Sequence, residues 1–153
     1  SLIKLDSPWD AERVNNGKFF PSNFDKPHEL NLVSTLKVTR RLSLSENLIF
    51  QTGRPITFPR GKFKFQDIPF VIYSDRNQYR IPDYFRIDAS LNLEGSHRKN
   101  KIAHSFWNFS VYNILGRNNP NAVYFINQDG VIKAYQNSIF AVAIPSISYT
   151  LSF

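Results

Sequence analysis

Residues 30–50 read LNLVSTLKVTRRLSLSENLIF, and this stretch decides the fold because its apolar side chains recur at every second position. Successive side chains of a β-strand point to opposite faces, so this alternation is typical of a strand with one apolar face. Two strands are predicted, one on each side of residues 39–41. Their apolar positions are Leu30, Leu32, Leu36 and Val38, then Leu42, Leu44, Leu48 and Phe50.

The two strands also predict their own pairing register. Residues that face each other in an antiparallel pair share a face, so Val38 opposite Leu42 gives the apolar residues apolar partners. The turn is then the three residues 39–41, whereas a two-residue turn would mismatch every row. The same register sets Ser34 opposite Glu46, the two polar residues on the otherwise apolar face.

Three further stretches alternate in the same way, at residues 86–94, 107–111 and 146–153. Between them, residues 52–85 and 116–137 carry prolines and turn residues and are expected to be long irregular loops. The connection at residues 97–101 is short and basic. Short and long connections in alternation are typical of a membrane barrel with tight periplasmic turns and long outer loops. A soluble domain rarely contains a structureless loop of this length.

Composition narrows the class of protein. The chain has 153 residues, no Cys, 15% aromatic residues and a net charge of +7. Disulfides and thiolate metal sites are excluded, and no apolar run approaches the roughly 20 residues of a membrane helix. The positive charge fits an anionic lipid leaflet, an anionic solute or ordinary solvated loops. Nucleic acid is not expected, because no binding motif accompanies the scattered basic residues.

The chain contains no Met, and residues 1–10 lack the charged and apolar regions of a signal peptide. We therefore expect a processed chain or a piece of a longer protein. About five strands cannot close a bacterial barrel, and an open edge in lipid leaves costly unpaired backbone groups. The prediction is an all-β fold: the C-terminal strands of an antiparallel transmembrane β-barrel, completed by the rest of the polypeptide or by another subunit.

The last predicted strand ends on Phe153, with Leu151 and Tyr149 at the alternate positions before it. A terminal aromatic residue preceded by alternate apolar residues resembles the signal that the barrel-assembly machinery reads. The other face of this strand carries only small hydroxyl residues, which suits a crowded and wet barrel lumen. These are Ser146, Ser148, Thr150 and Ser152.

Short motifs along nearly the whole chain resemble one family. They are QTGRPITFP at 51–59, NNGK at 15–18 with DKPH at 25–28, RIPDYFRID at 80–88, SVYN at 110–113 with RNNP at 117–120, and PSISY at 145–149. In this order they resemble the C-terminal barrel end of TonB-dependent outer-membrane receptors. The closest type carries a carboxypeptidase-regulatory-like domain at its N-terminus. Glu46 is the main departure, since an apolar residue is expected there.

The resemblance implies a barrel of about 22 strands filled by a plug, in the outer membrane of a Gram-negative bacterium. Such receptors import a bulky nutrient, such as an iron chelate, cobalamin or an oligosaccharide, and are neither enzymes nor cofactor proteins. Residues 1–28 would be an extracellular loop segment, and residues 29–153 transmembrane strands with outer loops near 52–85 and 116–137. The implied partners are the plug and N-terminal strands, TonB, the barrel-assembly machinery, outer-membrane lipid or lipopolysaccharide, and a surface lipoprotein.

Three sets of residues are candidate sites. A basic outer loop is the best candidate for contact with lipopolysaccharide phosphate or an anionic solute, and consists of Arg54, Arg60, Lys62, Lys64, Arg76 and Arg80. Arg86 and Asp88 share the polar face of one strand and predict a lumen-facing ion pair. Tyr149, Leu151 and Phe153 form the assembly signal.

No catalytic or metal site is expected. The three histidines, His28, His97 and His104, lie in loop or turn settings without the spacing of metal ligands. Residues 108–110 match an N-glycosylation sequon, but they lie within a predicted strand, so the match is interpreted as accidental. Two other functions stay open: a soluble β-sandwich that binds carbohydrate through aromatic loops, and an outer-membrane porin without a plug.

Overall fold

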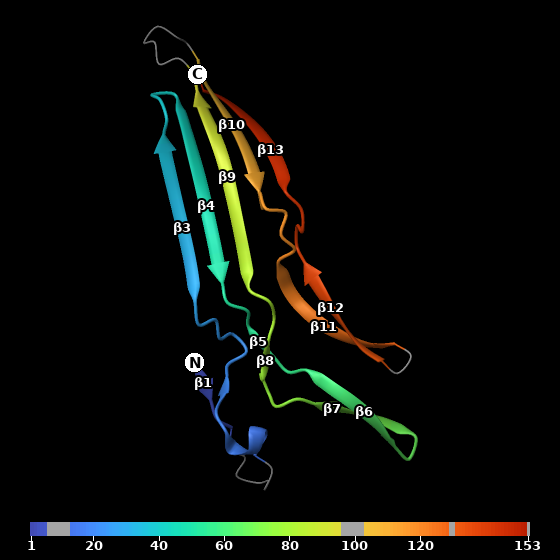
Figure 1. Ribbon diagram of the computed structural model, residues 1–153. Coiled ribbons are helices and arrows are strands. Elements are labelled where there is room, and N and C mark those ends of the chain that lie inside the picture. Colours follow the sequence, from blue (N-terminus) through green and yellow to red (C-terminus); the bar gives the residue numbers. More distant parts are fainter. Residues whose placement is uncertain (6–12, 96–102, 129–130, 153) are drawn as a thin grey trace. The chain divides into compact units, whose positions relative to one another are not determined.

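The computed structural model describes residues 1–5, 13–95, 103–128 and 131–152, and these residues form antiparallel β-structure (Figure 1). The all-β, antiparallel prediction is therefore confirmed. In the described part of the chain no helix is both long and apolar enough to cross a membrane. The chain divides into two units, and each is described by itself.

The sheet unit comprises residues 28–51, 84–119 and 138–153. It contains one five-stranded antiparallel sheet in the order β13-β10-β9-β4-β3. The five predicted strand regions are all present. Their bounds are β3 Glu29–Lys37, β4 Leu42–Gln51, β9 Tyr84–Glu94, β10 His104–Tyr112 and β13 Ile144–Ser152.

The first hairpin has the predicted register. Leu36 pairs with Leu44, and Ser34 lies opposite Glu46. The Val38 amide donates to the Leu42 carbonyl at 2.9 Å, which closes the turn at residues 39–41. The sequence therefore specified this register correctly, because a slip of one residue would have turned every leucine to the polar face.

The sheet has one apolar and one polar face along all five strands. The pairings align Leu36, Leu44, Leu91, Phe109 and Ile147 in a single apolar row. The neighbouring row on the other face contains only hydroxyl side chains. It consists of Thr35, Ser45, Ser90, Ser110 and Ser146.

Glu46 lies in the one row of the apolar face that lacks large side chains. The same row contains Ser34, Ala89, Val111 and Pro145. Pro145 is paired with Val111 without a shift in register, on a strand that pairs on one side only in the described sheet. An edge strand tolerates proline, because one row of its amides has no ladder partner.

The loop unit comprises residues 1–27, 52–83 and 120–137. Its elements are β1 Leu2–Ile3, the 3-10 turn η1 Val14–Gly17, β2 Phe20–Pro21, β5 Pro55–Ile56, β6 Pro59–Phe65, β7 Ile68–Tyr73, β8 Tyr79–Arg80, β11 Pro120–Gln128 and β12 Val131–Ser138. The expectation of long irregular loops at 52–85 and 116–137 is therefore wrong. Each contains a hairpin, β6–β7 in the first and β11–β12 in the second.

The sequence pattern does not predict the β6–β7 hairpin, for two physical reasons. Its two-residue turn uses Gln66 and Asp67 at φ 49° and 62°, a conformation that Asn-Gly usually marks. Pro59 and Pro69 also lie inside its strands. A two-stranded ribbon leaves one edge of each strand free, so proline is tolerated there although it argues against a central strand.

Candidate functional site

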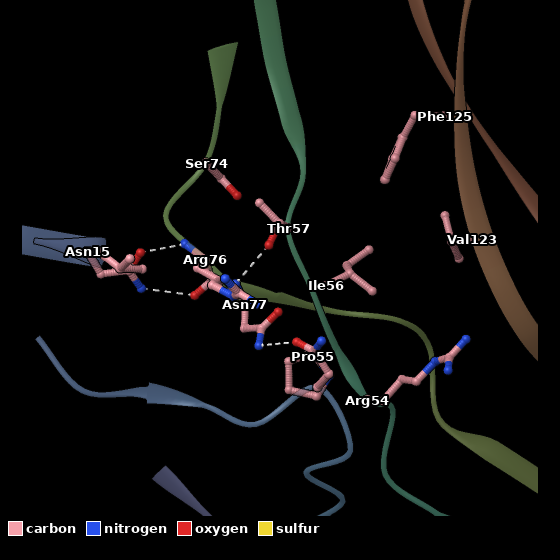
Figure 2. A pocket seen from close by; sticks show the side chains of 12 residues that line it. Asn15, Arg54, Pro55, Ile56, Thr57, Ser74, Arg76, Asn77, Val123 and Phe125 are labelled. Atoms are coloured by element: carbon pink, nitrogen blue, oxygen red, sulfur yellow. Dashed lines mark hydrogen bonds between the residues drawn. The ribbon is translucent and has the colours of Figure 1, made fainter. Parts of the chain in front are cut away.

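An open pocket of about 720 Å³ lies within the loop unit and gathers side chains from all three of its segments (Figure 2). Two arginines and no carboxylate line it, so it is electropositive. The lining residues are Val14, Asn15, Asn23, Arg54, Pro55, Ile56, Thr57, Ser74, Arg76, Asn77, Val123 and Phe125.

Asn77 builds the inner wall of this pocket. Its side chain is buried, with 6% of the residue exposed, and its Nδ2 donates to the Pro21 carbonyl at 2.7 Å and to Asn23 Oδ1 at 2.6 Å. Its backbone amide donates to Thr57 Oγ1 at 3.1 Å. Asn77 has φ 58°, a left-handed conformation that Asn adopts more readily than most residues. Asn77 thus links the N-terminal segment, at Pro21 and Asn23, to Thr57.

Asn15 holds Arg76 by pairing with its backbone. Asn15 Nδ2 donates to the Arg76 carbonyl at 3.0 Å, and the Arg76 amide donates to Asn15 Oδ1 at 2.7 Å. The arrangement copies the pairing of two strand residues. The Arg76 guanidinium lies 5.7 Å from the centre of the Phe20 ring and makes no hydrogen bond with the described residues. Its donors therefore remain available to a bound anion.

Arg54 is anchored from both its backbone and its side chain. Its guanidinium donates to the Asn121 carbonyl at 2.9 Å, and its own carbonyl accepts from Ile81 at 3.1 Å. The preceding Gly53 donates to Asp83 Oδ1 at 2.8 Å. A Cβ on Gly53 would lie 1.7 Å from the Ile81 carbonyl oxygen, so only glycine fits.

Arg80 is held by structural contacts. Its guanidinium donates to the Asp25 carbonyl at 3.0 Å, to the Asp25 carboxylate and to the Gly53 carbonyl at 2.9 Å. The hydrogen bond from Arg80 lowers the pKa of the Asp25 carboxyl. Arg80 therefore joins two loop segments, and its guanidinium is engaged in these contacts.

The other predicted loop cations lie at different places. Arg60 donates to Gln78 Oε1 at 3.0 Å and lines a second pocket of about 510 Å³, beside Phe58 and Tyr79. Lys62 and Lys64 lie on β6 and are exposed. Of the six predicted residues, the structure thus brings only Arg54 and Arg76 together at the first pocket.

On the sheet unit, the predicted ion pair between Arg86 and Asp88 is present. The Arg86 guanidinium lies 3.0 Å from Asp88 Oδ2 and donates to the Tyr84 hydroxyl at 2.9 Å. It also donates to the Tyr112 hydroxyl and lies 4.2 Å from the centre of that ring. The result is a compact polar cluster on the hydroxyl-rich face of the sheet.

Asp88 has a second role that the sequence did not reveal. Its Oδ1 accepts from the Asn113 amide at 2.9 Å. The Asn113 side chain, only 1% exposed as a residue, donates to the carbonyls of Arg117 at 3.0 Å and Phe140 at 2.9 Å. Asn113 therefore closes the base of the segment that contains β11 and β12. Its sequence signal was weak, an Asn at a strand end.

Two histidines and the C-terminal strand complete the residues that the sequence singled out. His28 and His104 belong to no group of three or more potential metal ligands in the described part of the chain. Tyr149 lies on β13, with its ring 4.5 Å from that of Trp107, and Leu151 is on the same strand. His97 and Phe153 lie outside the described residues.

Comparison of the chain with protein-family models, curated proteins and solved structures finds no match. The structure adds one observation to the quoted motifs, which is that they contact one another: Arg80 of RIPDYFRID binds Asp25 of DKPH and Gly53 of QTGRPITFP.

Proposed function

We propose that this chain is the C-terminal part of the barrel of a TonB-dependent outer-membrane importer of a bulky nutrient. The observation that carries the proposal is the two-faced, five-stranded antiparallel sheet. Its large apolar side chains remain exposed, with 56% of Leu32, 62% of Leu36 and 67% of Ile147 accessible. A soluble protein rarely leaves so continuous an apolar face uncovered.

Lipid is the solvent that suits this face. Outer-membrane strands alternate apolar residues toward lipid with polar residues toward the lumen, and the rows of this sheet follow that rule. Trp107 and Tyr149 lie together in one outer row, where aromatic rings of a barrel commonly meet the membrane interface. Glu46 falls in the row of small residues, so it does not lie directly beside the large apolar side chains of the neighbouring strands.

The polar face suits a wet lumen. Hydroxyl and amide side chains line it, and Asn108 donates to Asn92 across two strands. Thr35 and Ser45 hydroxyls lie 3.2 Å apart on the same face. The Arg86 and Asp88 cluster would face the plug in a complete importer. A porin without a plug would offer the same wall, so the plug belongs to the proposal through the motif resemblance alone.

The edges of the sheet call for further strands. In the described sheet, β3 pairs only with β4, and β13 only with β10. Unpaired strand edges cost several kcal/mol per group in lipid, so a barrel needs neighbours on both sides. The rest of the receptor would supply them, and Tyr149, Leu151 and Phe153 would guide closure by the assembly machinery.

The loop unit would face the outside and meet the nutrient or the lipopolysaccharide. Its pocket contains two arginines, an aromatic ring and several amide groups. Such a lining fits a solute that is polar and negatively charged, as many chelates and acidic sugars are. TonB would act through the N-terminal part of the importer.

Mass spectrometry of detergent-extracted outer membranes tests the proposal. Peptides of this chain should appear with peptides of upstream barrel strands and a plug, in one polypeptide or in a tight complex. Recovery of the chain alone, as a 17.8 kDa species in a detergent-free soluble fraction, would overturn it. That outcome would favour the carbohydrate-binding sandwich.

A further inference from the structure

The β6–β7 hairpin carries an apolar face that nothing in the proposed function uses. Its pairings place Phe63 with Phe70 and Phe65 with Ile68 on one face of the ribbon, and Ile72 lies on the same side. These five side chains are between 43% and 60% exposed. The Phe63 and Phe70 rings stack at 5.4 Å, which fixes the middle of this face.

The opposite face of the hairpin is occupied differently. Lys62 lies opposite Val71, and both line a small pocket that also involves Phe125 and Ile132 of the second hairpin. Because side chains alternate along a strand, the apolar face points away from that pocket. Its side chains are therefore exposed, on the two-stranded hairpin that Figure 1 shows as β6 and β7.

The chemistry of the face favours lipid as its occupant. None of its five side chains has a hydrogen-bonding group, whereas a protein interface contains polar groups that fix the register of the partner. Residues 59–73 contain Arg60, Lys62 and Lys64 against Asp67, a net charge of +2. An apolar face backed by basic residues is the pattern of segments that lie in the interface of an anionic membrane.

We propose that the β6–β7 hairpin docks its apolar face into a lipid surface with anionic headgroups. Phe65 and Ile68, beside the turn, would enter the region between headgroups and acyl chains. Lys62 and Lys64 would remain on the headgroup side, where they attract phosphate. The hairpin would thus anchor the loop unit to the membrane independently of the strands of the sheet.

The test uses nitroxide spin labels on the complete importer, reconstituted in vesicles of phosphatidylcholine with and without phosphatidylglycerol. The chain has no Cys, so F65C and F70C each add one label to it, with K64C as the matched site on the opposite face. Oxygen collides with labels in lipid, and a water-soluble nickel chelate collides with labels in water. The parent protein supplies the background signal.

Labels at Phe65 and Phe70 should be accessible to oxygen and shielded from nickel in anionic vesicles, while the Lys64 label should meet nickel. Replacing Lys62 and Lys64 by Gln should lower the ratio of docked to undocked hairpin by about fivefold per lysine. Equal nickel access at all three labels would overturn the proposal. So would shielding of the Phe65 label from both reagents, which would indicate a protein cover.

A fourth label, at Leu32 on the sheet, separates this proposal from the proposed function. If L32C meets oxygen and the hairpin labels meet nickel, the barrel stands and the hairpin anchor fails. If L32C meets nickel while the hairpin labels are shielded only in anionic vesicles, the barrel fails and the hairpin is a membrane anchor of a different kind of protein.

Discussion

Replacing Asn113 by Ala should release the base of the β11–β12 segment while leaving the sheet folded. Asn113 is the one residue whose side chain is bonded to both ends of that segment, at Arg117 and at Phe140, among the residues the structure describes. Ala removes the two donors at 3.0 and 2.9 Å and the acceptor for the Arg117 amide at 3.3 Å.

The expected cost follows from these contacts. Each of the three lost hydrogen bonds contributes about 1 kcal/mol net. Asn113 also has φ 52°, where Ala is disfavoured by about 1 kcal/mol. The local opening free energy should therefore fall by about 3–5 kcal/mol. Since about 1.4 kcal/mol is a factor of ten, amide exchange should accelerate by about 100-fold or more.

Hydrogen exchange followed by mass spectrometry on the complete protein in detergent measures this effect. Peptides covering 114–142 should exchange faster, and peptides from β3 and β4 should not change. Asn113→Gly should be about 1 kcal/mol less damaging than Asn113→Ala, because glycine tolerates positive φ. Asn121→Ala is the matched control, since Asn121 accepts from Arg54 through its backbone carbonyl, which Ala retains. Unchanged exchange in residues 114–142, or equal acceleration throughout the sheet, would refute the role assigned to the Asn113 side chain.

Three further predictions follow from the proposed barrel and concern the loop unit, the sheet and the assembly signal. Gly53→Ala should sharply reduce folded protein in the outer membrane, because its Cβ would meet a carbonyl oxygen at 1.7 Å, whereas Gly61→Ala, with nothing within 4 Å, should be neutral. If the sheet is part of a membrane barrel as proposed, Leu32→Arg should destabilise it by about 2–4 kcal/mol in a urea titration in lipid vesicles, while Val33→Arg on the opposite face of the sheet should cost far less. Deletion of Phe153 should lower outer-membrane yield in a fractionation blot, and unchanged yield would contradict its role as an assembly signal.

The sheet could be predicted from the sequence because its information is periodic. Residues 30–50 repeat one pattern with period two. A wrong register would pair apolar with polar residues in every row. The ion pair of Arg86 and Asp88 followed from the same rule, since residues two apart share a face. The presence of the strands, their two faces and the register of the first hairpin were thus all determined by local alternation.

The loop unit could not be predicted in the same way. Its hairpins depend on a turn of Gln66 and Asp67 that lacks glycine, and its prolines imitate breaks in structure. The pocket depends on contacts between residues that are 61 positions apart, such as Asn15 and Arg76. No short-range pattern encodes such a contact, so the basic loop appeared as one group of cations although the structure divides it.

In both units, asparagine side chains form hydrogen bonds with backbone groups that would otherwise be made by paired strands. Asn15, Asn77 and Asn113 all have positive φ, and each uses its side-chain amide to bind backbone groups of another segment. Asn119 does the same with the amide and carbonyl of Phe85. Asn suits this role because its amide resembles a peptide group and its backbone tolerates the left-handed region.

This use of asparagine changes what the family-like motifs mean. Asn15 of NNGK, Asn113 of SVYN and Asn119 of RNNP are all scaffold residues, as is Gly53 of QTGRPITFP. A motif built from such residues indicates which fold the chain has, because the residues stabilise that fold. It does not indicate which solute is bound. The specificity of an importer with this scaffold would depend on residues outside the motifs. Arg76, whose guanidinium lines the pocket and has no hydrogen bond to the described residues, is the first to examine.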